Sequence, residues 1–199
     1  VQTLIELTDI FDQETFEKEI ETLPNPISQA EAIANRTIRT ITEKLQEDEI
    51  FYQPFSERLK EILEQIRQKR YQDAEALLRE THDICDRVRN RNQRDDIPEP
   101  LRHREVAQAY YGIVYSQLQT LNHNPDLSAK IAIGIDDIIQ NNRIINWQKN
   151  NDVQNQMKNQ IEDFLFDELK ENHLSLDFDA IDYILDKCVA TAVIRLPDA

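Results

Sequence analysis

Residues 28–45, with the sequence SQAEAIANRTIRTITEKL, are typical of an amphipathic helix. Four apolar side chains recur at offsets of 0, 4, 7 and 11: Ala34, Ile38, Ile41 and Leu45. This spacing places them on one face of an α-helix. Ser28 and Glu31 have the spacing of a capping box, in which the hydroxyl and the carboxylate satisfy free amides of the first turn. The stretch therefore predicts a helix that begins at Ser28 and buries one face.

The same spacing recurs along most of the chain. Apolar residues repeat at intervals of three and four positions in these further segments: 1–22, 59–66, 74–88, 106–121, 127–139, 153–169 and 181–192. The chain has only two glycines, Gly112 and Gly134, whereas tight β-hairpins need glycine at positive φ. We therefore predict an all-α fold, an irregular bundle of about seven to nine helices in one body or two lobes.

Local signals mark where helices begin or break. Asp73 and Asp177 each precede a run with helical periodicity, and we predict both as N-caps. An aromatic group surrounds Pro54: Phe51, Tyr52 and Phe55. We expect this group to plug the space between two helices.

Residues 92–104 are the best candidate for a linker, because they are polar, charged and punctuated by Pro98 and Pro100. We therefore predict an N-terminal helical lobe over residues 1–91 and a C-terminal helical lobe over residues 105–199. One continuous helical domain fits the same pattern equally well. The chain begins at Val1 and enters a helical pattern at once, which is compatible with a piece of a larger protein.

The net charge is −15, from 23 basic and 38 acidic side chains, and it opposes a grip on a phosphate backbone by the chain as a whole. One basic run stands out: Arg87, Arg89, Arg91, Arg94, Arg102 and Arg104. It could contact DNA or an acidic partner surface. The alternative is a solvated helix end, where basic side chains suit the helix dipole.

No catalytic machinery is predicted in this chain. Two glycines separated by 22 positions cannot supply the glycine-rich loops that bind nucleotide phosphates, and we expect no cofactor. Cys85 and Cys188 are too few for a disulfide framework, and no apolar run reaches the length of a membrane span. We therefore expect a cytoplasmic protein without membrane contact.

Two candidate metal sites have simpler explanations. His82 and Cys85 lie at i and i+3, which could place two metal ligands on one helix face, but Cys85 also continues an apolar stripe. Asp163, Glu168 and Lys170 imitate a nuclease arrangement that needs a strand, whereas their segment has helical period. A core cysteine and a solvated acidic helix face are the preferred interpretations.

Trp147, the only tryptophan, lies in the sequence IINW of residues 144–147, between two predicted helices. We predict that it anchors the core at this junction. The alternative is a hot spot in an interface with another protein.

Several stretches together resemble the helical region that follows the helicase core in R subunits of type I restriction enzymes. They are LPNPISQAEAIANRT (23–37), EDEIFY (47–52) followed by Phe55 and Ser56, AYYG (109–112), IINW (144–147) and IEDFLFD (161–167). Their order and spacing agree across nearly the whole chain. One departure is Asn146, where the family pattern has Asp.

The resemblance implies a parent protein that joins a Mg²⁺-dependent nuclease and two ATPase domains to a helical C-terminal region. That parent translocates DNA with ATP and cuts it. Its helical region is similar to an assembly module that docks the motor subunit onto the methyltransferase and specificity subunits. The family's nuclease and ATPase motifs are not among these 199 residues, so no catalytic residue carries over.

The leading hypothesis is therefore a non-catalytic docking domain of such an R subunit. A second hypothesis makes the segment from Arg87 to Arg104 a DNA-contacting arm of the same subunit. A third is a free-standing acidic helical adaptor or DNA mimic, in which carboxylates substitute for phosphates.

Overall fold

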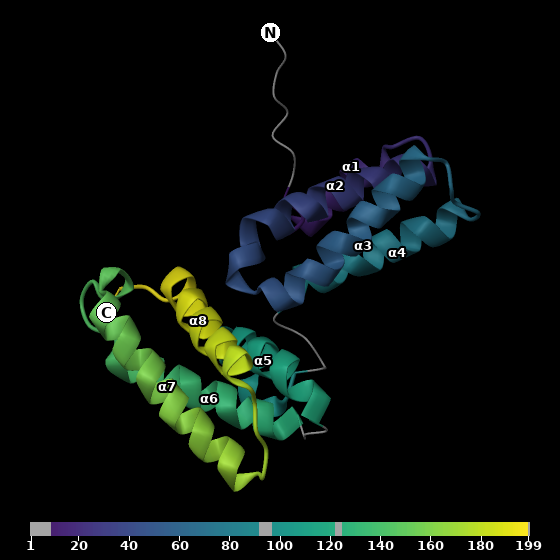
Figure 1. The fold of residues 1–199 in the computed structure, drawn as a ribbon. Coiled ribbons are helices and arrows are strands. Elements are labelled where there is room, and N and C mark those ends of the chain that lie inside the picture. Colours follow the sequence, from purple (N-terminus) through teal and green to yellow (C-terminus); the bar gives the residue numbers. More distant parts are fainter. Residues whose placement is uncertain (1–8, 92–96, 122–124, 199) are drawn as a thin grey trace. The chain divides into compact units, whose positions relative to one another are not determined.

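A computed structural model of the protein describes residues 9–91, 97–121 and 125–198. Within these ranges it contains eight α-helices and no β-strand (Figure 1), which confirms the predicted all-α bundle. The helices are α1 (Gln13–Glu21), α2 (Pro26–Lys44), α3 (Glu49–Arg67), α4 (Ala74–Arg89), α5 (Glu105–Leu118), α6 (Pro125–Asn142), α7 (Asn151–Glu171) and α8 (Phe178–Arg195). Short 3₁₀ turns are η1 (Leu45–Glu47), η3 (Glu99–Leu101), η4 (Gln119–Leu121) and η5 (Trp147–Lys149).

The chain divides into two compact units. The first comprises Val1–Leu45 and Phe51–Arg91, and the second comprises Gln46–Ile50 and Asn92–Ala199. The described part of the segment that the sequence marks as a linker, residues 97–104, is grouped with the second unit. Ile97 and Leu101 are buried in the core of that unit, so this part of the segment is packed.

The first unit contains helices α1 to α4, with α2 packed against α4 (Figure 1). Its core holds buried side chains from all four helices and from the segment that precedes α1: Ile10, Phe16, Ile20, Ile33, Ala34, Ile41, Tyr52, Leu59, Ile62, Leu77, Ile84, Cys85 and Val88. Ala34 and Ile41 are buried, and Ile38 and Leu45 are half-buried against the same core. The apolar face predicted from residues 28–45 is therefore confirmed.

The predicted N-caps Asp73 and Asp177 are confirmed. Asp73 Oδ1 accepts from the amides of Glu75 and Ala76, both at 3.0 Å, and Asp177 Oδ1 accepts from the amide of Ala180 at 2.8 Å. Each carboxylate satisfies amides of the first turn that have no partner within the helix.

The predicted capping box at Ser28 is wrong. Helix α2 begins at Pro26, and Asn25 is its N-cap, with Asn25 Oδ1 accepting from the Ser28 amide at 2.9 Å. Proline fits the first helical position because its fixed φ is already helical and its missing N–H would have no helical partner there. The helix therefore starts before Ser28, and the Ser28 hydroxyl is not the cap.

The aromatic group around Pro54 was expected between two helices, and the structure places it within one helix. Pro54 lies inside α3, five residues after its first residue Glu49, so the surrounding aromatic residues belong to one helix. The Phe51 ring makes edge-on contacts with the rings of Tyr52 and Phe55, at centroid distances of 5.0 and 5.2 Å. Near the helix start, a proline removes one backbone hydrogen bond without ending the helix.

In the second unit, α5 packs against α6 and α8, and α7 packs against the same two helices (Figure 1). The largest buried side chains of this core include Trp147, Tyr110, Leu101, Leu118, Ile131 and Ile135. Gly134 lets α6 and α7 approach closely, because a Cβ at this position would overlap the Phe164 ring. The space beside Gly112 is less restricted, with the nearest neighbouring atom at 3.4 Å from such a Cβ.

Both glycines lie inside helices, so other residues adopt the left-handed conformation where the chain turns. These are Lys69 after α3, Asn146 before η5 and His173 after α7, with φ of 52°, 62° and 56°. At the end of α7, the amide of Leu174 donates to the carbonyl of Leu169 at 2.9 Å, a bond typical of a Schellman motif.

Candidate interaction surface

The basic run predicted as a contact surface is divided between the two units. Arg87, Arg89 and Arg91 belong to the first unit, and Arg102 and Arg104 belong to the second. Arg94 lies outside the described residues. The surroundings of each described arginine therefore decide what it can contact.

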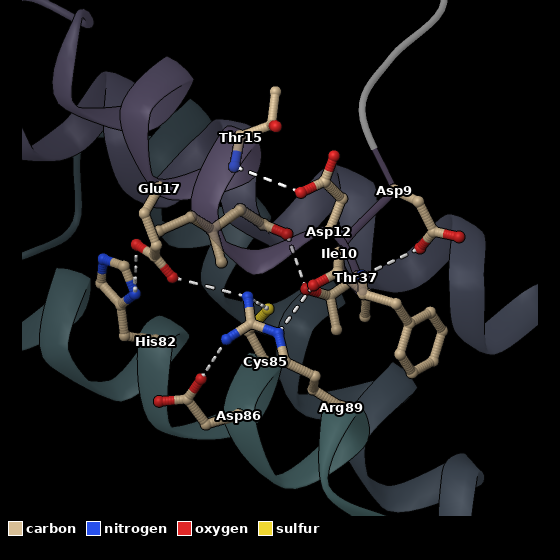
Figure 2. Close-up of polar contacts among 12 residues, drawn as sticks. Asp9, Ile10, Asp12, Thr15, Glu17, Thr37, His82, Cys85, Asp86 and Arg89 are labelled. Atoms are coloured by element: carbon tan, nitrogen blue, oxygen red, sulfur yellow. Dashed lines mark hydrogen bonds and ion pairs between the residues drawn. The ribbon is translucent and has the colours of Figure 1, made fainter.

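Arg89 is a buried structural residue of the first unit, with only 7% of its side chain exposed. Its Nε donates to the carbonyl of Ile10 at 2.7 Å, and its Nη1 donates to Asp86 at 2.7 Å (Figure 2). Its Nη2 lies 3.5 Å from Glu17 of α1. The planar guanidinium thus fastens α4 to α1 and to the segment that precedes α1.

Arg87 and Arg91 each lie over an aromatic ring of α3. The guanidinium carbon of Arg87 is 4.9 Å from the centroid of the Phe55 ring, and that of Arg91 is 5.8 Å from the centroid of the Phe51 ring. Arg91 is buried, whereas Arg87 remains exposed. These cation–π contacts help to hold α3 and the end of α4 together.

Arg104 pairs with two neighbouring carboxylates of α6 in the second unit. Its Nη1 lies 2.7 Å from Asp137 and 3.3 Å from Asp136. Burial raises the pKa of the Asp136 carboxyl, and this effect outweighs the opposing effects of Gln140 and Arg104. Arg102, two residues earlier, is exposed.

Trp147 is fully buried in the core of the second unit, where the C-terminal segment covers the turn that carries it. The indole Nε1 donates to the carbonyl of Pro197 at 3.4 Å, and Gln148 donates to the carbonyl of Leu196 at 2.9 Å. The left-handed Asn146 donates its amide to Asp198 at 2.7 Å. Asn adopts this conformation at little cost, so the departure from the family pattern fits the turn.

At the two candidate metal sites, several of the possible ligands are buried or lie beside other charged side chains of the chain. Cys85 is buried, burial raises the pKa of its thiol, and His82 Nδ1 lies 3.9 Å from Glu17. Glu168 is buried on α7 and pairs with Lys130 of α6 at 2.7 Å. Within residues 9–91, 97–121 and 125–198, no three side chains of the usual ligand types are grouped to hold a metal ion. In the same ranges, no helix has the length and apolar character to cross a membrane.

Exposed apolar side chains form a feature that the sequence analysis did not identify. Among the residues that the structure describes, the two most exposed large apolar side chains are Phe178, the first residue of α8, at 76%, and Ile145, before η5, at 72%. Phe166 on α7 is 42% exposed. A signal for Phe166 was present in the sequence, since it falls outside the apolar spacing that defines the buried face of α7. Phe178 gave no such signal, because it continues the apolar spacing of α8 three positions before Ile181, and it is exposed at the first position of that helix.

These features define an acidic all-α domain of two units, in which arginines of the central basic run support the fold. Residues 6–177 match the family described as the C-terminal region of endonuclease subunits like that of the type I restriction enzyme HindI. The match spans most of the chain, and the chain therefore belongs to this family, as the sequence resemblance predicted. Comparison of the chain with curated proteins and with solved structures found no match.

Proposed function

We propose that this chain is a non-catalytic docking domain, which joins the endonuclease subunit of a type I restriction enzyme to its methyltransferase and specificity subunits. The match to the C-terminal family of such endonuclease subunits carries this proposal. Type I enzymes work as assemblies of several subunits, so a helical C-terminal region has partners available to it.

The charge distribution supports a protein partner over bare DNA. The chain carries a net charge of −15, which repels a phosphate backbone. Arg89 and Arg104 already form ion pairs with carboxylates of the same chain. An acidic surface of this kind favours a partner with basic side chains, since complementary charge speeds encounter and fixes orientation.

On this proposal, the chemistry of the enzyme lies outside the chain. ATP and Mg²⁺ act in the motor and nuclease parts of the endonuclease subunit, and this domain holds neither of them. The assembly works in the cytoplasm, where its DNA substrate is found.

A pull-down tests the proposal directly. The purified chain is presented to the cognate methyltransferase–specificity complex at low and at high salt, with the full endonuclease subunit as the positive control. We expect binding at low salt that weakens as salt rises, because screening reduces attraction between opposite charges. If the full subunit binds at low salt and the chain does not, the docking surface lies in another part of the subunit.

Charge reversal separates docking from DNA contact. Arg87→Glu combined with Arg102→Glu changes two exposed basic residues, one in each unit. We expect docking to the protein complex to persist in this variant. A loss of duplex DNA binding by the variant, together with salt-sensitive DNA binding by the unaltered chain, would instead support a DNA-contacting arm.

A further inference from the structure

We infer that the outer face of the α7–α8 pair is the docking surface, and that it receives a basic protein surface with an apolar pocket. We call this face the Phe166–Phe178 face, and six residues define it: Lys158, Glu162, Phe166, Phe178, Asp182 and Asp186. The inference deepens the proposed function and rests on it.

Helix periodicity arranges these residues in two adjacent rows. Lys158, Glu162 and Phe166 follow one another at intervals of four on α7, so they share one side of that helix. On α8, Phe178, Asp182 and Asp186 also follow one another at intervals of four and form the second row. Lys158 Nζ lies 2.6 Å from Asp186 Oδ1, which joins the two rows at one end.

The two aromatic residues lie at the other end of the rows. Helices α7 and α8 pack together as an antiparallel pair connected by residues 172–177 (Figure 1). Phe166 is eight positions beyond Lys158, and Phe178 is eight positions before Asp186. At a rise of about 1.5 Å per residue, both rings are displaced by about 12 Å from the ion pair and lie at the same level.

The exposed rings of Phe166 and Phe178 favour burial by a binding partner. Phe178 is 76% exposed and Phe166 is 42% exposed, although each could bury a large apolar area. Aromatic side chains held on rigid helices lose little conformational entropy when they are covered, and for this reason they often dominate the binding energy of interfaces.

The surrounding charge identifies the chemistry of the partner. Residues 158–187, which include both rows, contain nine acidic side chains and three basic side chains, Lys158, Lys170 and Lys187. This density of carboxylates repels nucleic acid and anionic lipid, and a second copy of a chain with charge −15 is repelled as well. A protein surface with Lys or Arg around an apolar pocket satisfies both the rings and the carboxylates, and we assign it to the methyltransferase–specificity complex.

The test compares the full chain with two variants in binding to the methyltransferase–specificity complex. The first is Phe166→Ser combined with Phe178→Ser. The control is Ile145→Ser, which removes another exposed apolar side chain of the second unit. Thermal unfolding is measured first, and Phe178→Ser alone replaces the double variant if the latter is unstable.

We expect the double variant to bind at least tenfold more weakly and the Ile145→Ser control to bind as the unaltered chain does. A third variant, Glu162→Gln with Asp182→Gln, should show a smaller loss of affinity as salt rises, since it keeps the rings and removes two charges.

Results that contradict the Phe166–Phe178 face differ from results that contradict the docking function. Equal binding by all variants would overturn the Phe166–Phe178 face and leave the docking function intact. Equal losses in the double variant and in Ile145→Ser would contradict localisation to this face. If the unaltered chain does not bind the complex at low salt, the docking function fails and this inference fails with it.

Discussion

At the scale of single residues, the surroundings of Arg89 change the interpretation of the basic run. In the sequence Arg89 is one of six arginines available for a phosphate or an acidic partner. In the folded chain its guanidinium contacts Ile10, Glu17 and Asp86 and is nearly inaccessible to solvent. Its main role is therefore to stabilise the first unit.

Arg89→Leu should lower the free energy of unfolding by about 1–3 kcal/mol, because the buried carbonyl of Ile10 loses its donor and Glu17 loses its contact with the guanidinium. Urea denaturation followed by circular dichroism measures this change. Arg39→Leu is the matched control, since Arg39 forms an exposed pair with Glu43 and should cost less than about 0.5 kcal/mol. Equal costs for the two variants would contradict a structural role for Arg89.

Trp147→Ala should lower the free energy of unfolding by about 3–5 kcal/mol, the range for removal of a large buried side chain. Trp147→Phe should cost less, because it keeps an aromatic ring in the core and loses mainly the contact with Pro197. The chain has one tryptophan, so its emission reports on this site alone and should be blue-shifted in the folded state. Emission at the wavelength of free tryptophan would show an exposed indole and refute the core position.

Asp136 should give a specific dependence of stability on pH. Burial raises its pKa in the folded state, so the folded chain binds a proton there more readily than the unfolded chain. Its contribution to stability therefore grows as pH falls through the folded-state pKa, and its carboxylate costs stability at neutral pH. Asp136→Asn removes this titration, and its stability relative to the unaltered chain should be highest near pH 7 and decrease toward about pH 4.

Arg104→Gln provides a second measurement of the same effect. Arg104 lowers the pKa of Asp136 against the effect of burial, so its removal should make the stability of the chain rise more steeply on acidification. If the stability of Asp136→Asn relative to the unaltered chain increases as pH falls, this explanation is contradicted.

At the scale of helices, the two glycines allow a paired experiment. Gly112→Ala should stabilise the chain by up to about 1 kcal/mol, because alanine is the better helix former and its Cβ has room. Gly134→Ala should be less stable than Gly112→Ala by about 1–3 kcal/mol, since its Cβ must displace the Phe164 ring between α6 and α7. Thermal melts compare the two variants, and equal melting temperatures would show that α6 and α7 do not pack closely at Gly134.

The helices themselves could be predicted from the sequence, because the spacing of apolar residues reports directly on which face is buried. The start of α2 was misplaced because Asn25 with Pro26 is a stronger combination than a capping box at Ser28. The continuity of α3 through Pro54 was also missed, since proline is usually a helix breaker, and here the helix continues with the loss of one backbone hydrogen bond.

The roles of the arginines could not be predicted from the sequence. Arg89 meets Ile10 across 79 positions, and Arg104 meets Asp136 across 32 positions, so their partners depend on tertiary packing that local patterns do not specify. The exposed ring of Phe166 carried a clearer signal, because it interrupts the polar face of α7, whereas Phe178 continues the apolar spacing of α8 and its exposure could not be predicted from that spacing.

At the scale of the whole molecule, the chain is acidic, forms two helical units and belongs to the C-terminal family of type I endonuclease subunits. A net charge of −15 should make association with a basic protein surface fast at low salt and slower as salt rises. On the proposed docking function, this charge and the apolar residues exposed within it lie at the contact between subunits.

The most direct test of that function is competition within a reconstituted enzyme. The chain is titrated into a mixture of the full endonuclease subunit and the methyltransferase–specificity complex, and DNA cleavage and DNA methylation are measured together. If the chain occupies the docking site, cleavage should fall as the chain is added and recover when more endonuclease subunit is supplied, while methylation is unchanged. Undiminished cleavage at a large molar excess of the chain over the endonuclease subunit would contradict the docking function.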